Sequence, residues 1–264
     1  MRIILLVNDS YFAWRLAEPI FRGHHDNVRF VVFSRRIKSS PSAIYSIFRK
    51  ASLPYFGYRA TVQLVSAIAD RTCGRSVRSE CCKYNIRYAE TRDINSTPEL
   101  LNGGSFDLGV AINCDQIIRQ QVLDVCKRGI LNVHASKLPE DPGISPVLWA
   151  FARGDQVIWS SVYKMDRGLD TGPIIEQVPF AVEPGETAFR LYERICQGSG
   201  ARLSQIIEQF SRGDVAYRPQ QRSSAAKYLS WPDRTHYRLM RQNGRRFISC
   251  ADLVRAFATE RTPG

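Results

Sequence analysis

The first half of the chain alternates short apolar segments with segments of helical spacing, and this alternation limits the folds it can adopt. Strands are predicted at residues 2–7, 29–34, 86–89, 107–112 and 130–133. Helices are predicted between them, at residues 11–22, 61–84 and 118–126, with a short one after Pro98. Such alternation is typical of a mostly parallel sheet with helices on both faces. We therefore expect an α/β fold with a Rossmann-like sheet.

The second half follows a different pattern. Two predicted strands, 157–163 and 174–180, are too close in sequence for a helical crossover, so we expect an antiparallel pair. A long helix is predicted over residues 187–210, broken near Gly198 and Gly200. Beyond it, Asp233 is expected to cap a helix at 234–242, followed by a short strand at 245–248 and a last helix at 251–257. We expect a main domain of residues 1–214 and a small basic C-terminal region of residues 215–264.

Positive charge is concentrated in two zones of a chain whose net charge is +12. Residues 215–264 hold ten Arg and Lys residues against three acids, and no acid occurs between Asp26 and Asp70. Within that second zone, residues 35–59 combine basic residues with tyrosine and phenylalanine, and we expect a long loop with a short helix there. Such zones attract nucleotides, RNA or anionic membranes, or they form a solvated basic face.

Cysteine and histidine usage points to a protein without disulfides or metals. Seven cysteines make an odd count without a C-x-x-C pair, which indicates reduced thiols and a cytoplasmic location. The four histidines lack the spacing of a zinc site, so no metal is expected. Apolar runs are too short for a membrane span, and the N-terminal run is too brief for a signal peptide.

Two separated motifs supply a set of chemically useful side chains. The run GILNVHASKLP ends a predicted strand with Asn132 and His134, which point to the same side because they are two residues apart. The run MDRGLDTG places Asp170 in a glycine-flanked loop. An amide donor, an imidazole and a carboxylate suit acyl transfer. Taken singly, each residue is more often structural: a core histidine, a strand-ending asparagine, a turn aspartate.

The two motifs, in this order, resemble those of the folate-dependent formyltransferases. That family includes methionyl-tRNA, glycinamide ribonucleotide and sugar N-formyltransferases, and the likeness is dense from Phe106 to Gln177. It implies a catalytic domain at residues 1–214 and N10-formyltetrahydrofolate as the formyl donor. It also implies three roles: Asn132 holds the oxyanion, His134 moves the proton, and Asp170 fixes the imidazole tautomer and stabilises its cation.

The resemblance implies where the donor binds. In the family, the pterin contacts mainly backbone groups of two loops, which here contain Asn113, Cys114, Gln116, Ile117, Met165, Asp166 and Gly168. Asn113 and Cys114 replace the family's more usual Gly/Ala and aromatic pair. A G-x-G-x-x-G run is missing after the first strand, so a nicotinamide cofactor is not expected.

The acceptor site departs from the family pattern. Ser136-Lys137-Leu138-Pro139 replaces Ser-Leu-Leu-Pro, and Pro142-Gly143 replaces Arg-Gly. Ser136, Lys137 and Pro142 are therefore candidate substrate contacts, with Lys137 either compensating for the missing arginine or lying in solvent.

The number of residues after the long helix favours one acceptor class within the family. About fifty residues follow the long helix. This number is smaller than that in the C-terminal barrel of methionyl-tRNA formyltransferases, and larger than the number that follows the catalytic domain in glycinamide ribonucleotide formyltransferases. We expect a nucleotide-linked amino sugar, such as GDP-perosamine or a dTDP-4-amino-4,6-dideoxyhexose, formylated for lipopolysaccharide O-antigen synthesis. Nucleic acid is not expected as a partner, and a homodimer is in keeping with the sugar enzymes. The alternatives are a methionyl-tRNA formyltransferase-like enzyme and a catalytically silent folate- or nucleotide-binding protein.

Overall fold

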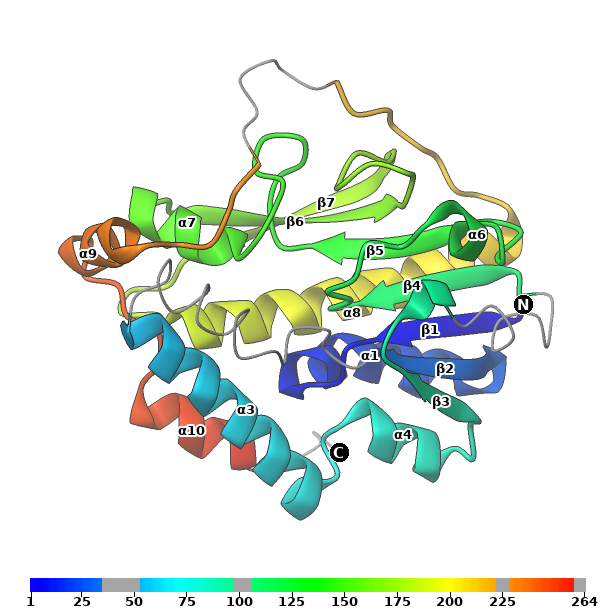
Figure 1. Ribbon diagram of the computed structural model, residues 1–264, viewed down its shortest axis with the longest axis horizontal. Helices are drawn as coiled ribbons and strands as arrows, with labels where there is room; N and C mark the ends of the chain where they lie inside the picture. The colour runs from blue at the N-terminus through cyan, green and yellow to red at the C-terminus, as the bar shows by residue number, and fades with distance from the viewer. Residues whose placement is uncertain (35–52, 97–105, 222–227, 259–264) are drawn as a thin grey trace.

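The structure, shown in Figure 1, is a computed structural model that describes residues 1–34, 53–96, 106–221 and 228–258. The predicted short helix after Pro98 lies outside the described residues, as does the part of the 35–59 segment before Leu53.

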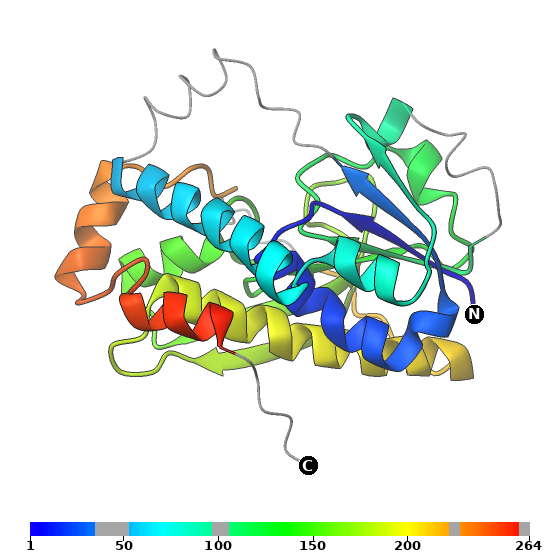
Figure 2. The ribbon, with the colours of Figure 1, turned by 90° about the horizontal axis from the view of Figure 1, so that it is seen from below.

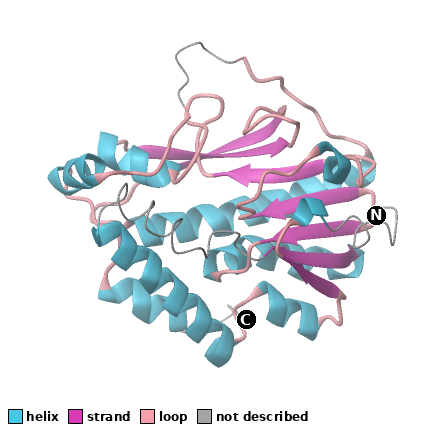
Figure 3. Ribbon diagram, viewed as in Figure 1, coloured by secondary structure: helices cyan, strands magenta, loops and turns pink. Residues whose placement is uncertain are grey.

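A seven-stranded sheet forms the centre of the molecule, in the order β3-β2-β1-β4-β5-β6-β7. Its strands are β1 (Ile3–Val7), β2 (Val28–Ser34), β3 (Tyr88–Thr91), β4 (Leu108–Ile112), β5 (Ile130–His134), β6 (Val157–Lys164) and β7 (Ile174–Ala181). The first five strands pair in parallel, whereas β6 and β7 pair antiparallel. The expected mostly parallel sheet and the antiparallel closing pair are therefore confirmed (Figure 3).

Helices cover both faces of the sheet. They are α1 (Tyr11–His24), α3 (Leu53–Cys73), α4 (Val77–Lys83), α6 (Gln120–Leu123), α7 (Pro146–Arg153), α8 (Ala188–Arg212), α9 (Arg234–Gln242) and α10 (Cys250–Phe257). Two short 3-10 turns, His25–Asn27 and Ile94–Ser96, complete the pattern. Helices α1 and α8 lie side by side against one face, as Figure 2 shows. No helix in the described part of the chain is long and apolar enough to span a membrane.

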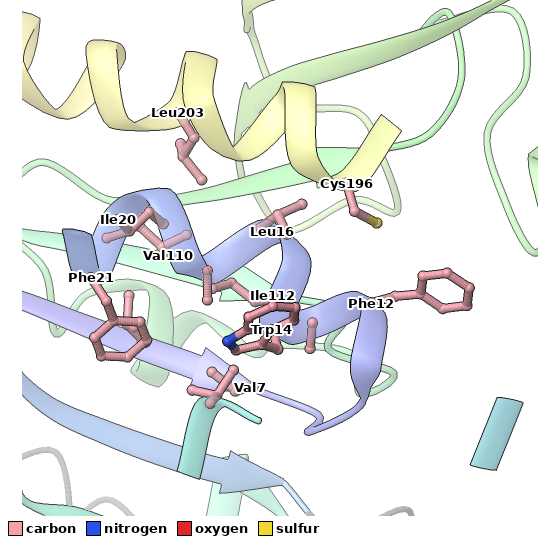
Figure 4. Close-up of a cluster of buried hydrophobic side chains, with 14 of the residues drawn as sticks. Val7, Phe12, Trp14, Leu16, Ile20, Phe21, Val110, Ile112, Cys196 and Leu203 are labelled. Atoms are coloured by element: carbon pink, nitrogen blue, oxygen red, sulfur yellow. The ribbon is translucent and has the colours of Figure 1, made fainter. Parts of the chain in front are cut away.

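Strand β1 is buried on both faces because it lies in the middle of the sheet. Ile3, Leu5 and Val7 join the cluster formed by α1 and α8, in which Leu16 and Leu203 also lie (Figure 4). Ile4 and Leu6 join the opposite cluster, which α6 covers. The core therefore consists of two layers separated by the sheet.

Helix α8 is continuous, so the break predicted near Gly198 and Gly200 is wrong. A Cβ atom on Gly200 would lie 2.3 Å from the carbonyl oxygen of Leu16, and one on Gly198 would lie 2.8 Å from the ring of Phe180. These glycines allow close packing of α8 against α1 and β7. Burial along the helix stabilises it despite the unfavourable helix propensity of glycine.

Several predicted boundaries also shift. Residues 53–59, at the end of the segment expected to be a long loop with a short helix, form the first turns of α3. The single helix predicted over 61–84 is two helices, because Gly74 adopts a φ of +62° and Ser76 caps the next helix. The helix predicted at 118–126 is confined to Gln120–Leu123.

The C-terminal residues pack closely on the rest of the chain. Asp233 caps α9, as predicted, by accepting from the amides of Thr235 and His236. The strand predicted at 245–248 does not form. Instead, the carbonyl groups of that segment accept hydrogen bonds from the first two amides of α8, with distances of 3.0 and 2.9 Å. The boundary at residue 214 stays a prediction.

The close helix crossing at Gly200 can be tested by substitution. We expect Gly200→Ala to destabilise the fold by about 1–2 kcal/mol, because overpacking outweighs the gain in helix propensity. Gly57, in α3, has no atom near its virtual Cβ, so Gly57→Ala should be neutral or stabilising by up to about 1 kcal/mol. Urea unfolding of both variants measures the difference, and equal stabilities would contradict the packing argument.

Candidate active site

The predicted site lies at the carboxyl end of β5, between a parallel and an antiparallel neighbour. Asn132 is in register with Ala111 of β4 on one side and Tyr163 of β6 on the other. His134 ends the strand opposite Ser161. Carboxyl ends of strands in open α/β sheets are where ligands usually bind.

The carboxamide of Asn132 is held at both ends. Its Nδ2 donates to the Tyr163 hydroxyl at 3.0 Å, and its Oδ1 accepts from the Val133 amide at 2.9 Å. These contacts fix which end of the amide is the donor. Because an amide nitrogen carries two hydrogens, one N–H has no partner among the described residues and can bind a ligand oxygen.

Asp170 adopts the left-handed conformation, with a φ of +54°, which aspartate tolerates better than most residues. Its Oδ1 accepts from the Tyr163 hydroxyl at 2.9 Å, and its Oδ2 accepts from the Gly143 amide at 3.0 Å. Burial, followed by the nearby Asp170 charge, raises the pKa of Tyr163 well above its usual value. Tyr163 is therefore a neutral donor to a carboxylate that is already held by a backbone amide.

The imidazole of His134 lies between a carbonyl and this carboxylate. Its Nε2 is 3.1 Å from the carbonyl oxygen of Asp141, and its Nδ1 is 3.9 Å from Asp170 Oδ1. A carbonyl oxygen only accepts, so Nε2 must carry the hydrogen and Nδ1 is the free base in the neutral ring. In this arrangement the Asp141 carbonyl sets the tautomer of the neutral ring, and the role of Asp170 in fixing it stays a prediction. Asp170 is placed to stabilise the cation once Nδ1 is protonated.

The loop that follows β5 keeps the Asp141 carbonyl in place. Ser136 Oγ donates to the same carbonyl at 2.7 Å, and the Asp141 carboxylate accepts two hydrogen bonds from the Arg153 guanidinium, at 3.1 and 2.8 Å. Arg153 is the last residue of α7. The orientation of His134 therefore depends on a loop tied to the end of a helix.

Together these groups can perform acyl transfer. The side chains of His134 and Asp170 are 12% and 17% exposed, so a ligand can reach them while much of the water is excluded. A free amide N–H, an unprotonated imidazole nitrogen and a carboxylate lie around one point of the sheet edge.

The two segments predicted to bind the donor converge on one face of the sheet. Cys114 follows β4 and Met165 follows β6, and both pack against the hydrophobic cluster covered by α6. Burial raises the pKa of the Cys114 thiol to about 11, so the thiol is protonated and unreactive at neutral pH. Asn113 has a φ of +49° and accepts from the Tyr192 hydroxyl at 3.2 Å.

The other predicted donor contacts divide into structural and exposed residues. The side chain of Gln116 bonds to the Ile94 amide and the Arg92 carbonyl, whereas Ile117 is 63% exposed. Asp166 accepts from the Gly168 amide at 3.0 Å, which closes the loop between β6 and β7.

The predicted acceptor contacts lie in the loop after β5, but their polar groups have partners within the protein. Ser136 is 3% exposed, with its hydroxyl on the Asp141 carbonyl. The ammonium of Lys137 is 3.2 Å from Glu140, and the Pro142 carbonyl accepts from the Leu229 amide at 2.7 Å. Their role in acceptor binding stays a prediction.

Sequence reasoning missed Tyr163 and Gln220. Gln220 Nε2 donates to the carbonyl oxygens of Asp170 and Gly172, at 3.2 and 2.6 Å. Tyr163 could have been found from the predicted antiparallel pairing of its strand, because a neighbour of Asn132 in register faces the same side. Gln220 left no signal, because its contact joins residues about fifty positions apart.

Comparison with known proteins agrees with this geometry. The family model described as formyl transferase matches residues 72–207. A methionyl-tRNA formyltransferase of Blochmanniella pennsylvanica is 32% identical over 52% of this chain and 44% of its own length. The chain thus spans about half the length of the curated relatives it matches.

Solved structures share the fold over more of the chain. Glycinamide ribonucleotide transformylase 1 of Symbiobacterium toebii has a TM-score of 0.59 at 19% identity, covering 84% of this chain and 94% of its own. The N-formyltransferase of Helicobacter canadensis, in complex with folinic acid and dTDP-3-aminofucose, has a TM-score of 0.57 at 16% identity, covering 97% of this chain and 81% of its own. Because the family model spans just over half of the chain and includes Asn132, His134 and Asp170, the protein belongs to the formyl transferase family.

Proposed function

We propose that the protein transfers a formyl group from N10-formyltetrahydrofolate to the amino group of a nucleotide-linked amino sugar. The observation that supports the reaction is the joined arrangement of Asn132, Tyr163, Asp170 and His134. These residues lie within the family match.

The residues have distinct tasks in this reaction. The neutral acceptor amine attacks the formyl carbon, and the free N–H of Asn132 stabilises the oxyanion that forms. Nδ1 of His134 takes the proton from the attacking nitrogen, while Asp170 stabilises the imidazolium. The bond between the formyl carbon and N10 then breaks, and N10 receives a proton from Nδ1. Atoms and charges balance without a metal or an oxidant.

One buried atom supports donor binding beside Asp170. Gln220 Oε1 is buried and has no hydrogen-bond partner among the described residues, although the Nε2 of the same side chain holds the Asp170 loop. A buried acceptor without a donor is costly. A pterin, with several N–H groups, is a ligand that could satisfy it.

The acceptor class is supported by the residues that depart from the family and by the Helicobacter canadensis enzyme, whose complex contains a nucleotide-linked amino sugar. Lys137 stands where a leucine is usual and Pro142 where an arginine is usual, so an acceptor different from that of the curated relatives is expected.

The second candidate acceptor is an aminoacyl-tRNA. It is favoured by the curated relatives, several of which are methionyl-tRNA formyltransferases. Their match covers only about half of their own length, and therefore supports the chemistry shared by the family more than the acceptor.

The acceptor can be determined directly. We expect tetrahydrofolate release when the protein is mixed with N10-formyltetrahydrofolate and GDP-, dTDP- or UDP-linked 4-amino sugars, followed by absorbance and mass spectrometry of the product. Release with charged initiator tRNA and with none of the sugars would reject the proposed acceptor and favour the second candidate.

The catalytic assignment predicts that substitutions of these residues lower kcat strongly and leave the protein folded. His134→Ala and Asp170→Asn should each lower kcat by about 10²–10⁴-fold, because proton transfer or its electrostatic support is removed. Circular dichroism should show a native fold, and single-turnover assays give the rate of the chemical step. Near-normal rates for either variant would refute the assignment.

Tyr163→Phe should act through positioning. Its hydroxyl fixes both Asn132 and Asp170, so we expect kcat to fall about 10–100-fold with KM for the donor nearly unchanged. Tyr88→Phe, on the exposed strand β3, is the matched control and should keep full activity. A Tyr163→Phe enzyme with a raised KM and normal kcat would show that the hydroxyl binds substrate instead.

A further inference from the structure

The start of α3 and the basic C-terminal residues, which are far apart in sequence, meet at one cavity. The cavity has a volume of about 550 Å³ and lies between the start of α3, the end of α9 and the segment before α10. Its walls include Tyr58, Tyr237, Arg241, Arg245, Arg246 and Phe247. The sequence alone left open whether the two basic zones bind anything or form a solvated face.

The cavity is cationic. Three arginines line it, and its lining contains no aspartate or glutamate. Within the described residues, Arg241, Arg245 and Arg246 form no ion pair with a carboxylate. The Nε of Arg245 is also buried without a hydrogen-bond acceptor there, while its guanidinium lies over the Phe151 ring. The arginines therefore leave hydrogen-bond donors available for an anion.

Helix α9 adds further positive charge beside the cavity. Arg234, Arg238 and Arg241 are spaced four and three residues apart, so they lie along one face of the helix, and α9 contains no acid. All three line a second hollow of about 590 Å³ that adjoins the first through Arg241 and Tyr237. Like charges at this spacing destabilise a helix. A bound anion would remove that repulsion.

The wall of the cavity also has a stack of aromatic rings. Phe247 lies between Tyr58, whose ring centre is 5.1 Å away, and Tyr237, at 5.5 Å, with interplanar angles of 15° and 5°. Guanidinium groups bind phosphate oxygens in pairs, and aromatic rings suit a planar base. Both kinds of group are found in one cavity of the size that small ligands occupy.

This wall is connected to the candidate active site. Tyr55 precedes Tyr58 by one helical turn, and its hydroxyl is 3.2 Å from the hydroxyl of Ser145. Ser145 follows Gly143 by two residues, and Gly143 donates its amide to Asp170. A ligand at the cavity can therefore influence the loop that holds the catalytic carboxylate.

We propose that the cavity binds the nucleoside diphosphate of the acceptor, with Arg241 and Arg246 on the phosphates and the Phe247 stack beside the base. The inference deepens the proposed function and rests on its acceptor class. A mononucleotide fits these observations better than RNA, because the arginines and aromatic rings line a concave site of limited volume.

The binding test needs neither folate nor turnover. Isothermal titration of the full chain with UDP, GDP and dTDP should show one site for at least one of them. The double variant Arg241→Gln/Arg246→Gln should weaken binding about tenfold or more, since each charged hydrogen bond lost costs at least that factor in favourable cases. Arg71→Gln, at the exposed far end of α3, is the matched control and should bind as the unaltered chain does.

Inorganic pyrophosphate and the Phe247→Leu variant distinguish phosphate binding by the arginines from base binding beside the Phe247 stack. Pyrophosphate binding should weaken in the arginine variant and be unchanged in Phe247→Leu, whereas nucleotide binding should weaken in both. Equal nucleotide affinity in the arginine variant and the control would overturn the proposal. So would tight, salt-sensitive binding of unfractionated tRNA through these arginines without nucleotide binding.

The His134→Ala protein distinguishes this inference from the proposed function. It should bind the nucleotide normally while formyl transfer is lost. If nucleotide binds but no amino sugar is formylated, the proposed reaction fails and the cavity stands. If sugars are formylated and the arginine variant has an unchanged KM for them, the cavity is not the acceptor site.

Discussion

The candidate site depends on the hydrogen bonds that the carboxylate of Asp170 accepts. One of its oxygens accepts from Tyr163 on β6, and the other accepts from the Gly143 amide in the loop after β5. The same residue has a left-handed backbone, and Gln220 holds its carbonyl oxygen. Three segments of the chain therefore meet at one residue. Hydrogen bonds to an ionised group are stronger than those between neutral groups, so this junction can fix geometry where no regular secondary structure does.

The sequence was sufficient for the parts of the site that short spacing determines. Asn132 and His134 share a side because they are two residues apart in a strand. The glycine-flanked Asp170 can be recognised from its sequence motif. Tyr163 was not found, because its role depends on the register between two strands. The Asp141 carbonyl could not be found at all, since every residue has one and only the folded loop aims it at His134. The sheet was predicted well for the same reason: apolar runs mark buried strands directly.

The errors in the fold share a physical cause. Glycine propensity predicts a break in α8, whereas in the structure Gly200 permits two helices to approach within a distance that a Cβ atom would prevent. The strand predicted at 245–248 instead caps the first turn of α8 with its carbonyl groups. In both cases local propensity was outweighed by packing between segments distant in sequence. Such contacts are also what bring the C-terminal region against the candidate site, through Gln220 and Leu229.

The proposed reaction and the proposed acceptor cavity therefore depend on different parts of this chain. The groups that we propose to move a proton and hold an oxyanion come mainly from residues 132–170, which lie within the family match. The cationic cavity is built from the start of α3, the end of α9 and the turn before α10, and all of its lining residues lie outside the family match. A relative that is similar to this chain only over that match gives no information on the residues that line the cavity. In this chain, changes to the charge and ring content of these outer segments should accordingly alter acceptor binding, while the hydrogen bonds around Asp170 stay the same.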